Sequence, residues 1–237
     1  TGIMALKRGV LLFLFLTPFL VLPQNESTVK VSWGPEFKSR YLVRSILPDS
    51  QPPFVLSVRK GAGFFRKEYL FELKNDMSLG RKLRVEPTYQ QIPLEYADAF
   101  SIGSKPHVFS FFNNRSHNAT YLFAQSIDDR TFKMSDDMKK VGQAPFISQR
   151  VSSNFNIQTS KNDSFVLVYS QLPSSKTQSE VVRYSVLDEE LNLLRQEDNK
   201  LALDLKTYRI EASIIDNSGN AFFVATRERS RNLLMRS

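Results

Sequence analysis

The sequence has no cysteine and only two histidines among its 237 residues. Without cysteine the chain has no disulfide, no lipid-modified cysteine and no thiolate ligand for a metal. The two histidines, His107 and His117, form no HExxH pair, so the sequence gives no sign of a zinc-protease site. We therefore expect the fold to be held by its apolar core alone.

The common motifs of nucleotide-binding and hydrolytic enzymes are also missing. The sequence has no GxSxG elbow, no GxxxxGK[ST] loop and no GxGxxG. Gly61-Ala62-Gly63 predicts only a flexible hairpin loop, and a serine triad would have to recruit His107 or His117 without a local signature. The sequence accordingly identifies no catalytic, cofactor-binding or metal-binding residue, and it predicts no cofactor.

Carboxylates do occur in runs, and each run has a structural interpretation. Asp128-Asp129, Asp136-Asp137 and Asp188-Glu189-Glu190 fall in or near the turn after a third strand, where aspartate caps turns with its own side chain. Asp216–Asn220 resembles part of a calcium loop but lacks the alternating acidic ligands and the distal glutamate. We predict a hairpin turn there.

One long apolar run is present, near the start of the chain. Val10–Leu22 is thirteen residues without a charge, preceded by Lys7-Arg8. A basic start and an apolar core of this length are typical of a secretory signal peptide, because a membrane-spanning helix needs about 20 apolar residues. We assign residues 1–3 to a reading-frame or cloning extension and 4–24 to the signal peptide, with no membrane span after cleavage. An uncleaved inner-membrane anchor is the alternative.

The rest of the sequence repeats one pattern of short strands. Strand-like runs begin at Phe54, Val108, Phe165 and Ala221, at intervals of 54, 57 and 56 residues. In each repeat one strand candidate precedes this run, and a third and a fourth candidate follow it. The last repeat has only its first two strand candidates. The preceding candidates are Arg40–Ile46, Tyr96–Ile102, Asn154–Thr159 and Arg209–Ile215.

Four strands per unit and a period near ~50 residues are typical of propeller blades. The predicted fold is therefore all-β, a β-propeller-like array of about three complete four-stranded blades and part of a fourth, over residues 25–237. We expect the aromatic side chains to pack between blades. An antiparallel sandwich with even spacing is the alternative. Because the fourth unit is partial, we expect the chain to be truncated, with C-terminal blades or a further domain missing.

Three phrases carry a resemblance to a known group. Val31–Glu36 (VSWGPE), Tyr121–Asp128 (YLFAQSID) and Tyr184–Asp188 (YSVLD) ahead of Leu191–Leu194 (LNLL) resemble the uncharacterised exported β-propeller proteins of Bacteroidetes. The resemblance implies an exported propeller, usually longer than this chain, and carries no catalytic residues. This chain departs from the pattern at Arg195, where an aromatic residue often stands.

Two classes of function remain open at this point. The favoured one is a non-enzymatic binding or scaffold module at the periplasm or cell surface, with a protein or glycan partner on loop-rich faces. These are Pro48–Pro53, Lys60–Lys67, Asn113–Asn118 and Leu172–Gln178. The alternative is a propeller that supports a glycan- or peptide-active hydrolase. Convergence of Asp98, His107 and Glu211 would favour the enzyme.

The net charge of +8 is spread along the chain. Scattered basic residues usually mark a solvated surface, although a basic face could still meet an anionic partner. The sequence contains no basic and aromatic motif of a nucleic-acid reader. We therefore expect no nucleic-acid partner.

Overall fold

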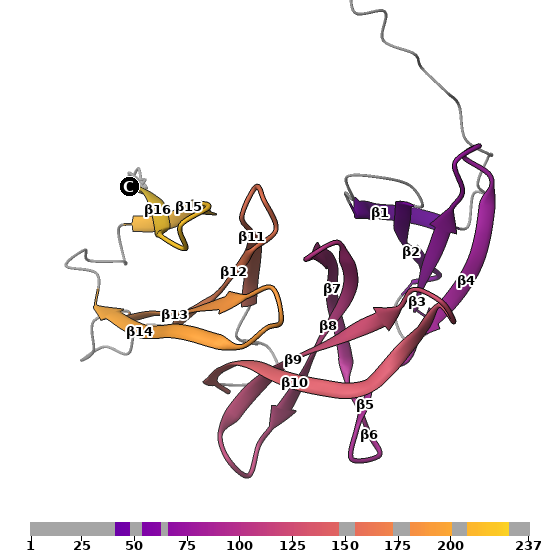
Figure 1. Cartoon of the computed structure of the whole chain (residues 1–237). Coiled ribbons are helices and arrows are strands. Elements are labelled where there is room, and N and C mark those ends of the chain that lie inside the picture. Colours follow the sequence, from indigo (N-terminus) through magenta and orange to yellow (C-terminus); the bar gives the residue numbers. More distant parts are fainter. Residues whose placement is uncertain are drawn as a thin grey trace, which may run out of the picture. The chain divides into compact units, whose positions relative to one another are not determined.

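The computed structural model describes residues 41–47, 54–62, 66–146, 155–172, 181–200 and 208–227. Every regular element in these ranges is a β-strand, and none of the described residues forms a helix suited to crossing a membrane (Figure 1). The strands form three four-stranded antiparallel sheets and two two-stranded ones.

Within each four-stranded sheet the strands lie side by side in chain order (Figure 1). The first sheet contains β1 (Tyr41–Leu47), β2 (Phe54–Lys60), β3 (Lys67–Leu73) and β4 (Leu79–Val85). The second contains β7 (Glu95–Ile102), β8 (Lys105–Asn114), β9 (Ala119–Asp128) and β10 (Lys133–Pro145). The third contains β11 (Phe155–Thr159), β12 (Phe165–Leu172), β13 (Val181–Asp188) and β14 (Leu193–Lys200). A fourth sheet pairs β15 (Tyr208–Ile215) with β16 (Ala221–Arg227).

Neighbouring sheets pack face to face through apolar clusters. Val55 and Leu70 of the first sheet meet Val108 and Ile127 of the second, and Phe109 and Leu122 on the other face of the second sheet meet Val166 of the third. The third sheet in turn packs Leu167, Tyr184 and Val186 against residues of β15 and β16. Middle strands are therefore buried on both faces, which explains their continuous apolar runs.

A buried hydrogen bond joins the first two sheets. The Ser57 and Tyr96 hydroxyl groups lie 2.8 Å apart, and burial raises the pKa of Tyr96. The bond satisfies two polar groups inside an otherwise apolar junction, where an unpaired hydroxyl would be costly.

The predicted blade-like array is confirmed. The strand candidates in the described ranges form strands whose ends differ from the prediction by at most a few residues, and each group of four forms one meander instead of crossing between two sandwich sheets. The longest strand is β10, which continues to Pro145. Asp136 and Asp137 lie inside this strand, at a bulge between Met134 and Met138, and not in the preceding turn.

Several predictions fall outside the described residues. These are the extension at 1–3, the signal peptide at 4–24, the VSWGPE phrase at 31–36, the loop at 48–53 and the segment after Arg227. Parts of the loops predicted at 60–67 and 172–178 also lie outside them.

Candidate functional site

A small hairpin between the first and second sheets departs from the repeat. It consists of β5 (Thr88–Tyr89) and β6 (Ile92–Pro93), joined by Gln90 and Gln91, whose φ angles are 48° and 67°. The Leu94 amide donates to the Pro87 carbonyl at 2.9 Å and closes its base. The Tyr89 ring stacks on Phe123 of β9, with centroids 4.7 Å apart, so the hairpin is fastened to the second sheet.

Pro93 of this hairpin forms one side of a groove of about 480 Å³, which we call the aromatic groove. Its other walls come from the start of β7, the end of β8, the following turn and the residue after β10. The lining residues are Pro93, Glu95, Phe111, Phe112, Asn113, Arg115 and Phe146. Three phenylalanine residues and three polar residues therefore line one depression.

Local hydrogen bonds hold Asn113 and the turn that carries Arg115. Asn113 Oδ1 accepts a 2.7 Å bond from the Thr120 hydroxyl, which fixes the amide so that its Nδ2 is the end that can donate to a ligand. In the adjoining turn, Asn114 Oδ1 accepts from the Ser116 hydroxyl and from the His117 amide. Arg115 is thus presented on a turn with internal support, and its side chain is exposed.

A second, polar pocket of about 370 Å³ lies at the opposite ends of the same strands, against the β13–β14 turn. It is lined by Ile102, Gly103, Lys105, His107, Ala124, Ser126, Asp137, Lys139, Glu189, Glu190 and Leu191. Lys139 Nζ donates to the Glu190 carbonyl at 2.6 Å and to Asn192 Oδ1 at 3.3 Å. The lysine therefore ties the second sheet to the third.

His107 is the buried titratable group of the polar pocket. Its Nδ1 lies 2.9 Å from the Lys105 carbonyl, which requires the proton on Nδ1 and leaves Nε2 as an acceptor. Burial lowers the pKa of His107, so the ring is neutral at pH 7. Ser126, its neighbour across β8 and β9, donates to the Ser135 hydroxyl at 3.1 Å, so this serine is not the partner of a Ser–His pair.

The convergence of Asp98, His107 and Glu211 that would favour an enzyme does not form in this pocket. Asp98 Oδ1 accepts from the Ala99 amide in β7, and Glu211 Oε1 accepts from the Thr226 hydroxyl in the fourth sheet. The lining of the pocket that contains His107 includes neither carboxylate. Among the described residues, moreover, no group of three or more histidine, aspartate and glutamate side chains could hold a metal ion.

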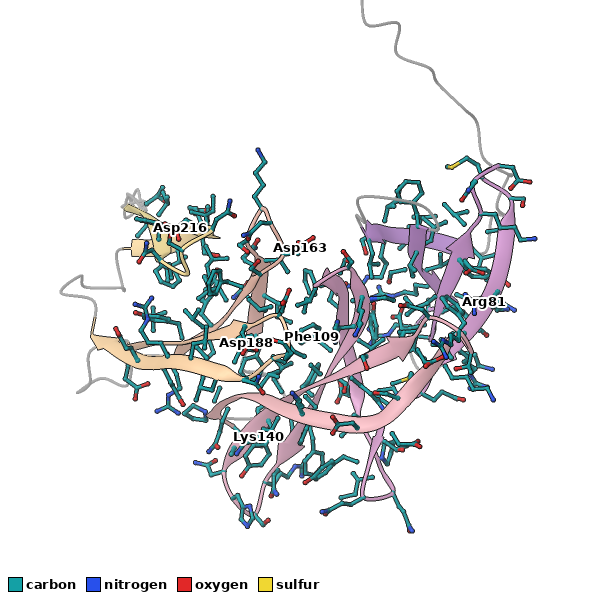
Figure 2. All side chains as sticks on the ribbon, in the orientation of Figure 1. Arg81, Phe109, Lys140, Asp163, Asp188 and Asp216 are labelled. Atoms are coloured by element: carbon teal, nitrogen blue, oxygen red, sulfur yellow. The ribbon has the colours of Figure 1, made fainter. Side chains whose placement is uncertain are left out.

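The aspartates of the predicted turns have the structural role that was expected. Asp128 accepts from the Thr131 amide at 2.6 Å, and Asp188 accepts from the Asn192 amide at 2.7 Å. In the β15–β16 turn, Asp216 accepts from the Ser218 and Asn220 amides, and Figure 2 shows Asp188 and Asp216 at their turns. Hydrogen bonds lower the pKa values of Asp128 and Asp216.

No protein-family model and no curated protein matches this chain. Among solved structures, the chain is similar to the endo-arabinase from Bacteroides thetaiotaomicron VPI-5482, with a TM-score of 0.42 and 11% identity, over 76% of this chain and 72% of that one. A likeness of this size carries no information about activity or substrate.

The aromatic groove was not foreseen from the sequence. Asn113 and Arg115 belong to a loop that was predicted to face a partner, but Pro93, Glu95 and Phe146 were not connected with it. The available signal was the short TYQQIP segment between two predicted strands.

Proposed function

We propose that this chain is a non-enzymatic binding or scaffold module that holds a protein or glycan partner through the aromatic groove. One observation supports the proposal above others: phenylalanine residues line a depression together with Glu95, Asn113 and Arg115, which differ in charge and hydrogen-bonding type. Aromatic residues beside a few polar groups that set the orientation of a ligand are common in binding sites.

The chemistry of the groove suits a ligand with an apolar face and a polar edge. Aromatic rings attract the C–H face of a sugar or the side chains of an extended peptide. Asn113 can donate through its amide, Glu95 can accept, and Arg115 can give a charge-assisted hydrogen bond. The insertion of β5 and β6 supports a specific role, because this hairpin adds a wall to the groove that the four-stranded repeat does not require.

We also propose that the module acts after export, at the periplasm or cell surface, as in the Bacteroidetes propellers that it resembles. The support is the sequence pattern alone, namely the basic start and apolar core of residues 7–22 and the three shared phrases.

The direct test is calorimetric titration of the mature chain with two panels, cello-, xylo- and chito-hexaose on one side and extended octapeptides on the other. A ligand that uses the groove should bind Arg115→Ala about tenfold more weakly, because one charge-assisted bond is lost. Arg130→Ala is the matched control, since Arg130 is an exposed arginine in another turn of the same sheet. Equal affinities for the Arg115→Ala and wild-type chains would refute the groove as the binding site.

The hydrolase alternative has one observation in its favour. His107, with its acceptor Nε2, lines a pocket together with Asp137 and Glu189. If this pocket were catalytic, the wild-type chain would hydrolyse members of the same panels and His107→Asn would not. Absence of turnover together with groove-dependent binding is the result that the binding module predicts.

A further inference from the structure

One glutamate of the first sheet is surrounded by an excess of cations. Glu68, at the start of β3, has a side chain only 5% exposed. Its Oε1 lies 2.9 Å from Arg59 Nε, 3.4 Å from Arg66 Nε and 3.8 Å from Arg44 Nη1. Its Oε2 is buried and accepts no hydrogen bond within the described part of the chain. Three guanidinium groups thus share a single carboxylate oxygen.

Two lysines near this site lie on the other face of the sheet. Lys60 and Lys67 are directly opposite each other across the β2–β3 hairpin, one residue along from the Arg59 and Glu68 pair. Because successive side chains of a strand face opposite sides of a sheet, these lysines do not take part in the contacts of Glu68. We call Arg44, Arg59 and Arg66 the basic cluster; with Glu68 they carry three positive charges and one negative charge.

Two other carboxylates of the described strands, one buried and one exposed, are each paired with a single arginine. At the opposite end of the first sheet, Arg81 donates to both oxygens of Glu72, at 2.9 and 2.5 Å, and this fork lowers the pKa of Glu72 (Figure 2 labels Arg81). In the third sheet Arg183 makes a similar fork to Asp198. Glu68, with three arginines around it, therefore differs from these one-to-one pairs.

The arginines of the cluster are held in place but keep donors that face water. The Arg44 guanidinium lies 5.5 Å from the centre of the Tyr96 ring, and Tyr96 belongs to the apolar cluster between the first and second sheets. The side chains of Arg44, Arg59 and Arg66 remain 27%, 27% and 41% exposed. Each guanidinium has five N–H donors, and the bonds to Glu68 use a minority of them.

From this geometry we infer that the basic cluster is an oxyanion-binding site, for the sulfate, phosphate or carboxylate group of a ligand. Glu68 orients the guanidinium groups from within, and a second anion on the exposed side completes their coordination. Arginine forks suit tetrahedral and planar oxyanions, and the excess positive charge disfavours metal cations. The same group can come from a free inorganic ion or from an acidic polysaccharide. The site lies on β1 to β3, whereas the aromatic groove is formed by β6 to β8 and nearby residues.

The test uses sodium sulfate, sodium phosphate, dextran sulfate and uncharged dextran as probes in calorimetry with the full mature chain. We expect sulfate, phosphate and dextran sulfate to bind, with affinity falling as salt screens the charges, and uncharged dextran not to bind. Tighter binding of dextran sulfate per sulfate group than of free sulfate would identify a polymer as the source. Equal affinity per group would identify a free ion.

Arg66→Ala should weaken dextran sulfate binding about tenfold. Arg66 is the most exposed of the three arginines, and thermal unfolding of each variant checks that it is folded. Arg84→Ala removes the same charge from β4, where Arg84 is paired with Glu86, and should leave binding unchanged. Equal losses in Arg66→Ala and Arg84→Ala, or no binding of any anion, would overturn the inference.

Discussion

The aspartates that begin the turns show how a single residue type repeats one structural function. Asp76, Asp128, Asp188 and Asp216 each accept a backbone amide two to four residues ahead. These turns are exposed, so the aspartate oxygen replaces water as the acceptor and holds the backbone in the turn conformation. Their recurrence after strands is a consequence of folding and not a sign of catalysis.

Replacing Asp188 with alanine should therefore destabilise the protein by about 1 kcal/mol, because the Asn192 amide and side-chain Nδ2 both lose their acceptor. Asp188→Asn keeps an oxygen at the same place and should cost less than half as much. Denaturant unfolding of the two variants measures the difference. Equal losses would mean that charge matters here and hydrogen bonding does not.

His107 should make stability depend on pH. Its pKa in the folded protein lies below the ordinary value of 6.5, because the ring is buried and Lys105 and Lys139 oppose its charge, while Asp129 favours it. The unfolded chain then takes up a proton first as pH falls, so folding stability decreases below pH 6.5 and is regained above it.

The measurement is the urea midpoint of the wild type and of His107→Asn at pH 8, 7, 6 and 5. Asparagine can still donate to the Lys105 carbonyl but does not titrate, so the variant should lose less stability between pH 7 and 5 than the wild type. His117 is present in both proteins and contributes equally. Parallel pH profiles would contradict a lowered His107 pKa.

At the scale of elements, the sequence predicted the strands that have buried side chains, because burial produces a regular pattern of apolar residues. Phe54, Val108 and Phe165 begin buried runs bounded by turn residues, and each begins or lies within the second strand of a sheet. β5 and β6 were missed because two-residue strands show no period, and because Gln90 and Gln91 are not the glycine or asparagine that usually mark such a turn.

The aromatic groove and the basic cluster could not be predicted from the sequence, because they depend on which strands are neighbours. Phe146 meets the β8 residues of the aromatic groove only after β9 and β10 have folded back. Arg44 reaches Glu68 from a strand that is two places away in the sheet. Alternation assigns such residues to a face but does not give their position along it.

The β5–β6 turn offers a test of local strain. Gln90 and Gln91 both have positive φ, a backbone conformation that is strained for residues with a Cβ. The pair Asn-Gly adopts this turn conformation more readily. The double variant Gln90→Asn, Gln91→Gly should stabilise the protein by about 1 kcal/mol, or roughly 2–4 °C in thermal midpoint. Calorimetry checks this, and a lowered midpoint would mean that the glutamine side chains make contacts worth more than the strain.

At the scale of the whole molecule, stability depends on sheets that cover one another. Gly142 shows how close the junction of the second and third sheets is: a Cβ there would lie 3.2 Å from Phe155 and 3.3 Å from Val168. Among the described residues, the fourth sheet is covered on one face only. Ile215 and Phe223 pack against the third sheet, whereas Ile214, Phe222 and Val224 on the opposite face are 61%, 53% and 56% exposed.

This uncovered apolar face should make the chain associate with itself as its concentration rises, because burial of three large apolar side chains is favourable. In addition, β16 has no partner on its outer side among the described strands. Light scattering coupled to size exclusion should show a mass above 27.2 kDa that increases with loading. Val224→Lys places a charge on the face and should reduce the mass toward the monomer. Ser218→Lys adds the same charge in the exposed turn and should not. If both variants associate as the wild type does, the contact lies elsewhere and this face is not what joins the copies.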